Sequence, residues 1–432
     1  MTMIVWMNTQ RRSNNKNIEV LQAVAYCKMA KPYKPRILRP RMRRSLIALI
    51  IVPVAIATVM GQDFVTRMYD YRVEHDVVYD TVTTFRSGSE GLQYDVYVPE
   101  NGVRNRPVVF WIHGGAFVAG SRRDVAWACQ RWAQRGYVAV SIGYRLGFYS
   151  PFPVDPPFAY DTAEVCRAAW RAIVDIRSAI HHTLDHADDY EIDTSRIVIG
   201  GYSAGAIAAL TNVFLDTAQR RFPSADTLRD VERLFERFPR PRLESLPRYI
   251  RPRAVVGLFG GLLDTAYLQT SPPPLFLYHQ TEDPVVACER RRGLWGMPLD
   301  VGANYPMIAG SCFLERELSK RGLLPSQLEF VSYVGIAHEP HNAALVDSLA
   351  AVFCAQHVTT ISGFVENESA PPAQGHYQLL DTDIVSAVVS LHGERVYGST
   401  EGITWSEIRQ TLRSGLWIVQ AGRTWVPVVV IP

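Results

Sequence analysis

The chain has 432 residues, of which 47% are hydrophobic and 11% aromatic, so it holds enough apolar material for a large core and an additional domain. Its formal net charge of +3 is small and acids are interleaved with the arginines, which argues against a nucleic-acid partner. No glycine-rich loop precedes a Lys-Ser or Lys-Thr pair and no cysteines and histidines have zinc spacing, so we expect neither a nucleotide cofactor nor a metal.

Residues 1–41 differ in composition from the rest of the chain. Only one of the five lysines of the protein, Lys320, lies beyond them. We therefore interpret residues 1–41 as a non-native upstream extension, with the true start at Met42. The lysines inside the extension are Lys16, Lys28, Lys31 and Lys34.

Residues 42–61 have the pattern of a secretory signal peptide. Arg43 and Arg44 come first, an apolar stretch of about 15 residues follows, and Gly61 ends it. The alternative is a membrane anchor, but Pro53 and the short stretch argue against one, because a span needs about 20 apolar residues. We expect a bacterial protein that is secreted or displayed at the cell surface, without stable membrane insertion after the signal is cleaved.

Residues 62–361 alternate between strand and helix patterns. Such alternation predicts a mostly parallel sheet flanked by helices, the α/β class. The apolar runs expected to form strands in its first part and centre are 108–112, 137–142, 197–199 and 254–259, and the long helices expected are 161–182 and 343–357.

The first of these strands ends in His113, Gly114 and Gly115. Two glycines let the main chain turn closely, so that its N–H groups can point at a developing oxyanion. The simpler interpretation is a plain turn after a strand. We expect His113 to fix the loop by hydrogen bonds rather than to act as an acid or base.

The strand at 197–199 runs directly into Gly201, Ser203 and Gly205, a Gly-x-Ser-x-Gly pattern, and then into a small-residue helix. A serine on such a strand-to-helix elbow is presented sharply, and the amide after it is free to bind an oxyanion. The alternative is an ordinary turn with a serine that caps the helix.

Two further strand patterns end in groups that could act on this serine. The strand at 275–279 is followed by Asp283, and the strand at 328–333 leads to His338. An acid just beyond a strand end can hold an imidazole in one tautomer. The order is Ser203, Asp283, His338, with gaps of 80 and 55 residues.

With these four motifs, the chain resembles the carboxylesterase and lipase side of the α/β-hydrolase superfamily, the group with a His-Gly-Gly oxyanion motif. The resemblance covers roughly residues 75–360 and implies an α/β-hydrolase fold. It implies Ser203 as nucleophile, Asp283 as acid and His338 as base. The oxyanion donors it implies are the amides of Gly114, Gly115 and Ala204.

Two assignments within the resemblance have neighbours that compete. Glu282 adjoins Asp283, but the family's acid usually precedes a Pro-Val-Val-like segment, which favours Asp283. His341 competes with His338, which fits the family's Gly-x-x-His spacing. Residues 279–281 read His-Gln-Thr where the family usually has His-Gly-Thr.

Two segments inside the catalytic region invite further interpretation. Residues 216–253 form an arginine-rich insertion that is either a cap over the substrate pocket or a solvated surface element. Cys288 and Cys312 flank a loop rich in glycine and proline directly after Asp283, where an exported enzyme could use a disulfide. The alternative is two unpaired thiols.

Beyond the catalytic region, residues 362–378 have the composition of a linker. Residues 379–432 are rich in strand patterns and predict a small β-sandwich-like module. The segments 389–397 and 414–419 resemble the C-terminal sorting domain of proteins exported by the type IX secretion system of Bacteroidetes, although the usual Asn-Pro is absent. A partner in that machinery is therefore implied; the alternative is an accessory module, for instance one that binds carbohydrate.

Together these patterns predict a secreted serine carboxylic-ester hydrolase that works through an acyl-enzyme. The expected substrate is a small-molecule or polysaccharide-linked ester. The alternatives are a serine exopeptidase of the same fold and a non-catalytic adhesion protein on a hydrolase scaffold.

Overall fold

The computed structural model describes residues 64–84, 88–149, 159, 161–215, 244–263, 265–268, 271–297, 302–324 and 326–359, together with the backbone of four strands between 384 and 430. The predicted upstream extension, signal peptide and linker, and most of the predicted insertion, lie outside the described residues. No helix among the described residues is both long enough and apolar enough to cross a bilayer.

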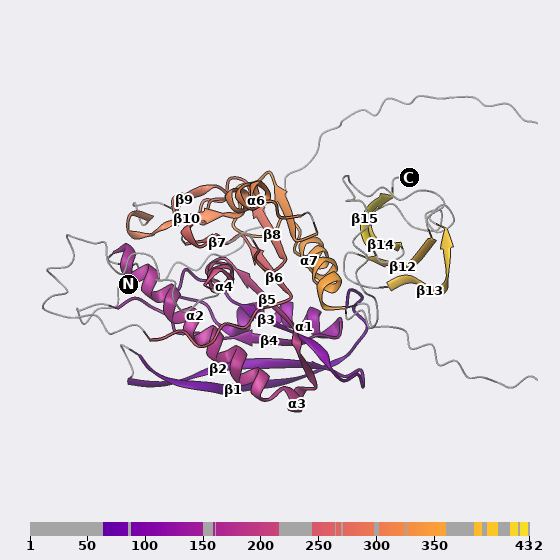
Figure 1. Ribbon diagram of the computed structural model, residues 1–432, viewed down its shortest axis with the longest axis horizontal. Helices are drawn as coiled ribbons and strands as arrows, with labels where there is room; N and C mark the ends of the chain where they lie inside the picture. Colours follow the sequence, from indigo (N-terminus) through magenta and orange to yellow (C-terminus); the bar gives the residue numbers. More distant parts are fainter. Residues whose placement is uncertain are drawn as a thin grey trace, which may run out of the picture. The chain divides into compact units, whose positions relative to one another are not determined.

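A central sheet of eight strands organises the catalytic region (Figure 1). Its strands are β1 (Tyr71–Thr84), β2 (Gly88–Pro99), β3 (Arg106–Ile112), β4 (Val138–Ile142), β5 (Ile192–Tyr202), β6 (Ala254–Leu258), β8 (Leu275–Gln280) and β11 (Leu328–Tyr333). They lie in the order β1-β2-β4-β3-β5-β6-β8-β11. Only the pairs β1–β2 and β2–β4 are antiparallel, and every other pair is parallel. The expected mostly parallel sheet is thus confirmed, and with it the α/β-hydrolase fold.

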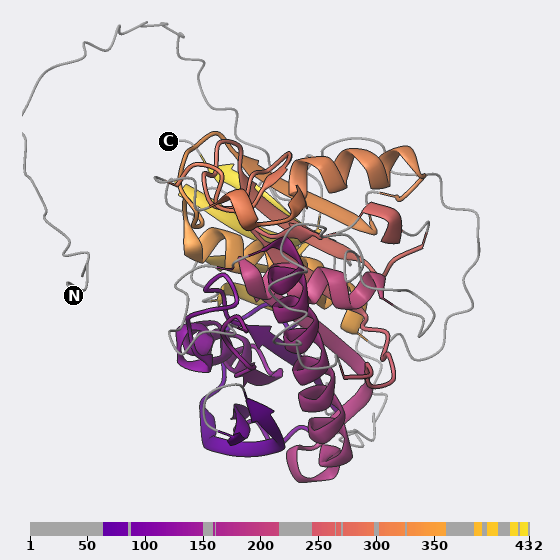
Figure 2. The ribbon, with the colours of Figure 1, turned by 90° about the vertical axis from the view of Figure 1, so that its left-hand side faces the viewer.

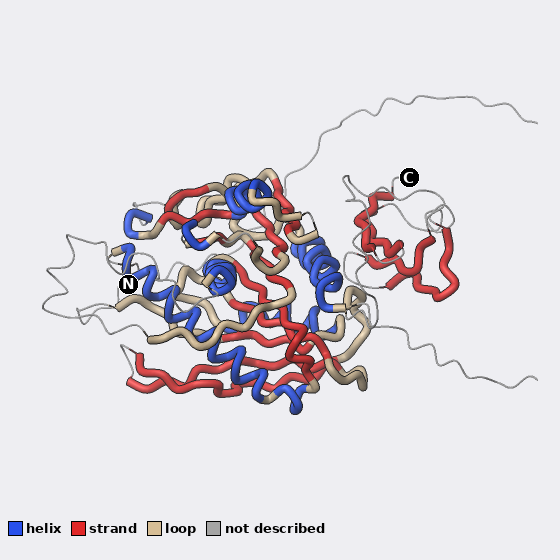
Figure 3. Tube along the Cα trace, viewed as in Figure 1, coloured by secondary structure: helices blue, strands red, loops and turns tan. Residues whose placement is uncertain are grey.

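Helices cover both faces of this sheet (Figures 1 and 3). The helices are α1 (Ala126–Gln134), α2 (Thr162–Asp185), α3 (Ala187–Tyr190), α4 (Ala204–Phe214), α6 (Ser311–Lys320) and α7 (Ala343–Val358), with short 3-10 turns η1 (Arg122–Val125) and η2 (Thr265–Tyr267). Figure 2 shows the long α2 in magenta. Its first turn is capped by Asp161, whose carboxylate accepts the N–H of Glu164 at 2.7 Å.

The alternation of side chains along β3 shows how the two layers form. Val108, Phe110 and Ile112 belong to one buried cluster, which contains residues of α2 and α4. Val109 and Trp111 belong to the other, which contains residues of α1 and α7. All seven residues of β3 are buried, which explains why a parallel strand of this kind reads as an unbroken apolar run.

A second, three-stranded sheet was not predicted. It joins β7 (Gly261–Leu262), β10 (Met307–Gly310) and β9 (Arg290–Arg292) in antiparallel pairs. Strands of two to four residues are too short to show a period of two, so hydrophobic patterning could not reveal them. Most of this sheet lies in the segment between β8 and β11, residues 281–327, which we call the excursion.

The part of the predicted insertion that the structure describes, residues 244–253, contains neither helix nor strand. Buried charge holds it in place: Arg145 binds Asp175 of α2 at 2.6 Å and also Glu244, at 2.7 Å through its Nη1. Trp170 of α2 donates its indole N–H to the Glu244 carbonyl at 2.8 Å. These described residues therefore pack on α2.

The described strands of the C-terminal region form a single antiparallel sheet. They are β12 (Ile384–Ser390), β13 (Arg395–Thr404), β14 (Gly415–Ala421) and β15 (Thr424–Val430), in the order β13-β12-β14-β15. The strand-rich character predicted for residues 379–432 is confirmed.

Candidate functional site

Ser203 lies on the elbow between β5 and α4. Its φ of 54° is in a region that non-glycine residues rarely adopt, as expected for a nucleophile elbow. The backbone around it is packed too closely for side chains: a Cβ on Gly201 would lie 2.4 Å from the backbone of Gly205, and one on Gly205 would lie 2.2 Å from the Ile112 oxygen. The two glycines of the motif are therefore steric requirements of the elbow.

His338 lies between Ser203 and Asp283. Its Nε2 is 2.7 Å from the Ser203 Oγ, and its Nδ1 is 2.6 Å from the Asp283 Oδ2. A carboxylate can only accept, so Nδ1 carries the proton and Nε2 is left to accept the serine O–H. The three residues come from the ends of β5, β8 and β11, which meet at the carboxyl edge of the parallel sheet.

The carboxylate of Asp283 is fully buried. Burial by itself raises the pKa of a carboxyl group, but hydrogen bonding with His279 and His338 outweighs it, and the pKa of Asp283 lies below the ordinary value of an aspartate. The N–H groups of Val285 and Val286 also donate to its Oδ1, at 2.8 and 3.2 Å. The acid is therefore ionised at neutral pH.

The competing residues lie elsewhere. Glu282 is exposed. The Nδ1 of His341 is 3.0 Å from the hydroxyl of Tyr278, and its ring stacks on Tyr333 at a centroid distance of 4.1 Å. The structure thus brings Asp283 and His338, rather than their neighbours, to Ser203.

The loop after β3 approaches the serine from the other side. A Cβ on Gly114 would lie 3.1 Å from the Ser203 Cβ. No described residue accepts a hydrogen bond from the N–H groups of Gly114, Gly115 or Ala204. Unpaired N–H groups next to a serine are what an oxyanion hole requires.

His113 is a structural element of this loop, in line with the expectation from the sequence. It is buried, its Nδ1 donates to the Gly114 carbonyl at 2.8 Å, and its ring stacks on Tyr144 at 4.3 Å. Burial lowers the pKa of His113, so the ring is neutral at pH 7. The Tyr144 hydroxyl donates to the His113 carbonyl at 3.0 Å and fixes the same turn.

A pocket opens beside Ser203, and its wall is almost entirely apolar. The glycine loop and the excursion between β8 and β11 supply most of the wall, including Ala116, Phe117, Val285, Leu294 and Tyr305. A pocket of this lining suits an uncharged, apolar group.

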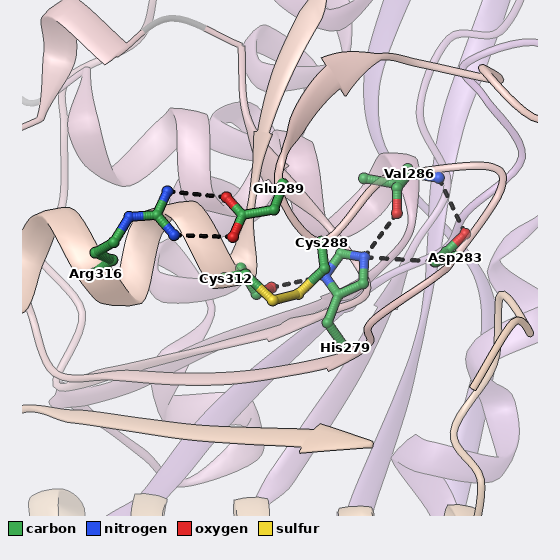
Figure 4. The surroundings of a disulfide bond; sticks show 8 residues. His279, Asp283, Val286, Cys288, Glu289, Cys312 and Arg316 are labelled. Atoms are coloured by element: carbon green, nitrogen blue, oxygen red, sulfur yellow. Dashed lines mark hydrogen bonds and ion pairs between the residues drawn. A yellow bond between two sulfur atoms is a disulfide. The ribbon is translucent and has the colours of Figure 1, made fainter. Parts of the chain in front are cut away.

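Cys288 and Cys312 form a disulfide in this excursion (Figure 4). It joins the segment after Asp283 to the first turn of α6. Cys129, Cys166 and Cys354 are buried thiols.

His279 is a site neighbour that the motifs did not single out. It is fully buried, and its Nε2 lies 2.7 Å from the Val286 carbonyl and 3.4 Å from the Asp283 carboxylate (Figure 4). Its Nδ1 is 2.9 Å from the Ser311 hydroxyl. The signals in the sequence were its place at the end of a strand, four residues before Asp283, and its match to the histidine of the family's His-Gly-Thr.

Sequence comparisons agree with this geometry. The chain matches the BD-FAE family over residues 94–228, a range that contains the glycine loop and Ser203. Esterase LipQ of Mycobacterium tuberculosis is 30% identical over 218 residues, 46% of this chain and 47% of that protein. The probable carboxylic ester hydrolase LipM of the same organism is 26% identical over 60% of this chain and 57% of its own length.

The chain therefore spans about half the length of these curated relatives. A solved structure, described as a truncated form of carbohydrate esterase from gut microbiota, aligns with 68% of this chain and 98% of its own, at 16% identity and a TM-score of 0.46. The sequence relatives support an α/β-hydrolase of the carboxylesterase type.

We predict that the disulfide stabilises the protein measurably. Closing a loop between positions 24 apart restricts the unfolded chain by about 3 kcal/mol in the loop-entropy model. Reductant, or the double substitution Cys288→Ser and Cys312→Ser, should lower the melting temperature, as measured by calorimetry. Reductant should have no further effect on the double variant, and recovery of both wild-type cysteines as free thiols by peptide mapping would contradict the prediction.

Proposed function

We propose that the protein is a serine carboxylic-ester hydrolase with Ser203, His338 and Asp283 as its catalytic residues. The observation that carries the proposal is the continuous chain of short contacts from the buried carboxylate through the imidazole to the serine, 2.6 and 2.7 Å long. The strained elbow and the apolar pocket beside Ser203 support it.

In this mechanism the Ser203 Oγ attacks the ester carbonyl carbon while the His338 Nε2 takes the serine proton. The carbonyl π electrons move to the oxygen, and the amides of Gly114, Gly115 and Ala204 donate hydrogen bonds to the oxyanion that forms. A preorganised donor of this kind contributes about 3 kcal/mol to transition-state stabilisation. The tetrahedral intermediate then collapses, the C–O bond breaks, and the alcohol leaves with the proton from His338.

Water completes the cycle. His338 takes a proton from the water molecule, the resulting hydroxide attacks the acyl carbonyl, and Ser203 leaves with that proton. Asp283 holds the imidazole in the required tautomer throughout and stabilises the imidazolium, which its low pKa permits because the carboxylate stays charged. The substrate we propose is a small-molecule or polysaccharide-linked ester that places an apolar group in the pocket.

We predict that Ser203→Ala retains its fold and loses ester hydrolysis by a factor of about 10³ or more, because the acyl-enzyme can no longer form. Hydrolysis of p-nitrophenyl esters measures the loss, and a labelled fluorophosphonate should modify only the wild type, at Ser203. As a control, Ser195→Ala removes an exposed hydroxyl that bonds Asp193 and should leave activity unchanged. A Ser203→Ala variant with a tenth of wild-type activity would refute the assignment.

We predict that His338→Ala is at least about 100-fold more damaging to kcat than His341→Ala, because only His338 contacts both Ser203 and Asp283. For the same reason Asp283→Asn should reduce kcat strongly and Glu282→Gln should not. Adding His338→Ala to Ser203→Ala should cost little more, since the residues act as a unit. Equal, mild effects of the two histidine substitutions would place the base elsewhere.

We further propose that the protein is exported, by way of the predicted signal peptide, and that residues 379–432 act in type IX export. The product recovered outside the cell should then begin between Ala57 and Gln62 and lack the C-terminal module. Intact-mass measurement of secreted material tests both ends at once. A secreted product that still ends at Pro432 would instead favour an accessory module.

A further inference from the structure

Gln280 occupies a position at which the family that this chain resembles usually has glycine. It is the last residue of β8, three residues before Asp283, and only 4% of it is exposed. A buried primary amide carries two donors and an acceptor, and each must find a partner or weaken the fold. The hydrogen-bond partners of the Gln280 amide therefore indicate the structural role of this side chain.

Both ends of the Gln280 amide bind the loop that carries His338. Its Nε2 donates to the carbonyl of Glu339 at 2.8 Å, and its Oε1 accepts the N–H of Ala337 at 3.0 Å. These backbone groups belong to the residues immediately before and after His338. One side chain thus fixes the main chain on both sides of the base.

These contacts continue the sheet beyond its last paired residues. The pairing of β8 with β11 ends at Gln280 and Tyr333. Beyond it, the N–H of Thr281 donates to the Tyr333 carbonyl at 2.9 Å, and the N–H of Glu282 donates to the Gly335 carbonyl at 2.9 Å. Beyond these two backbone bonds, the side-chain amide of Gln280 makes the next two bonds to the loop, at Ala337 and Glu339.

The large apolar side chains before His338 contribute little to holding this loop. Val334 is 85% exposed and Ile336 is 77% exposed, so neither anchors the loop in the core. Gly335 leaves the space that Gln280 fills, because a Cβ there would lie 2.1 Å from the Gln280 Oε1. Hydrogen bonds rather than apolar burial therefore fix the path of the chain into His338.

We propose that Gln280 is a positioning residue that holds His338 in line with Ser203 and Asp283. This inference rests on the proposed function, since it assigns Gln280 a role in the same reaction. Gln280 acts through the backbone of its neighbours. An error of about 1 Å in the placement of a reacting group can cost on the order of 100-fold in rate, so a loop without these two bonds loses kcat more than substrate binding.

Two substitutions of similar size test the proposal. Gln280→Met removes both hydrogen bonds and should lower kcat about 10- to 100-fold, with KM within about twofold of wild type. Deuterium exchange of the peptide spanning residues 334–340 should become faster, because the Ala337 amide loses its acceptor. The matched control is Gln134→Met in α1, which removes the bond from Arg67 and should change neither kcat nor the exchange of that peptide.

Gln280→Glu adds a readout that depends on pH. At this buried position the pKa of the introduced carboxyl group is raised. When protonated, the group can donate to the Glu339 carbonyl and accept from the Ala337 N–H, as the amide does; when ionised, it repels that carbonyl. The ratio of variant to wild-type kcat should therefore rise as the pH falls from 8 to 5.5, whereas the ratio for Gln280→Met should stay constant.

The outcomes separate this proposal from the proposed function. If Gln280→Met keeps wild-type kcat and exchange, or loses thermal stability with unchanged exchange at 334–340, the positioning role is overturned. A flat kcat ratio for Gln280→Glu across this pH range also overturns it. If the wild type hydrolyses no ester while the exchange of 334–340 responds as expected, the proposed function fails and the anchoring of His338 by Gln280 is supported.

Discussion

The contact between the backbone of α4 and the end of β3 determines where everything else in the site can lie. A Cβ on Gly205 would come within 2.2 Å of the Ile112 oxygen, so helix and strand meet with no side chain between them. Ser203, two residues earlier, is thereby brought against the turn that starts at His113. The elbow and the glycine loop therefore form one packed unit that holds Ser203 beside the backbone of Gly114.

The base and the acid are held by different forces. Asp283 is fully buried and accepts hydrogen bonds from the N–H groups of Val285 and Val286. Its carboxylate also interacts with His279 and His338. His338 is on a loop in which Val334 and Ile336 are exposed and the backbone is hydrogen-bonded to Gln280. Asp283 is thus held in a buried network of hydrogen bonds, whereas the backbone on both sides of His338 is held by the Gln280 side chain.

The central strands and the three site residues could be predicted because each combines an unbroken apolar run with a functional group at its carboxyl end, a pattern local in sequence. The β1–β2 hairpin was missed because β1 has a largely exposed face and an irregular register, so its period of two is blurred. The role of Gln280 could not be found either, since its partners lie 57 and 59 residues away. Sequence showed only that this position departs from glycine.

The segment between β8 and β11 both lines the pocket beside Ser203 and contacts Asp283. Leu294 and Tyr305 line the pocket, and the adjacent Trp295 donates its indole N–H to the Asp283 carbonyl at 2.9 Å. Within the same segment, the disulfide ties Cys288 to Cys312 at the start of α6. Because one segment carries both the pocket wall and contacts to the acid, a substitution that reshapes the wall also disturbs the support of Asp283. Under the proposed mechanism, pocket shape and turnover are therefore coupled on this side of the site.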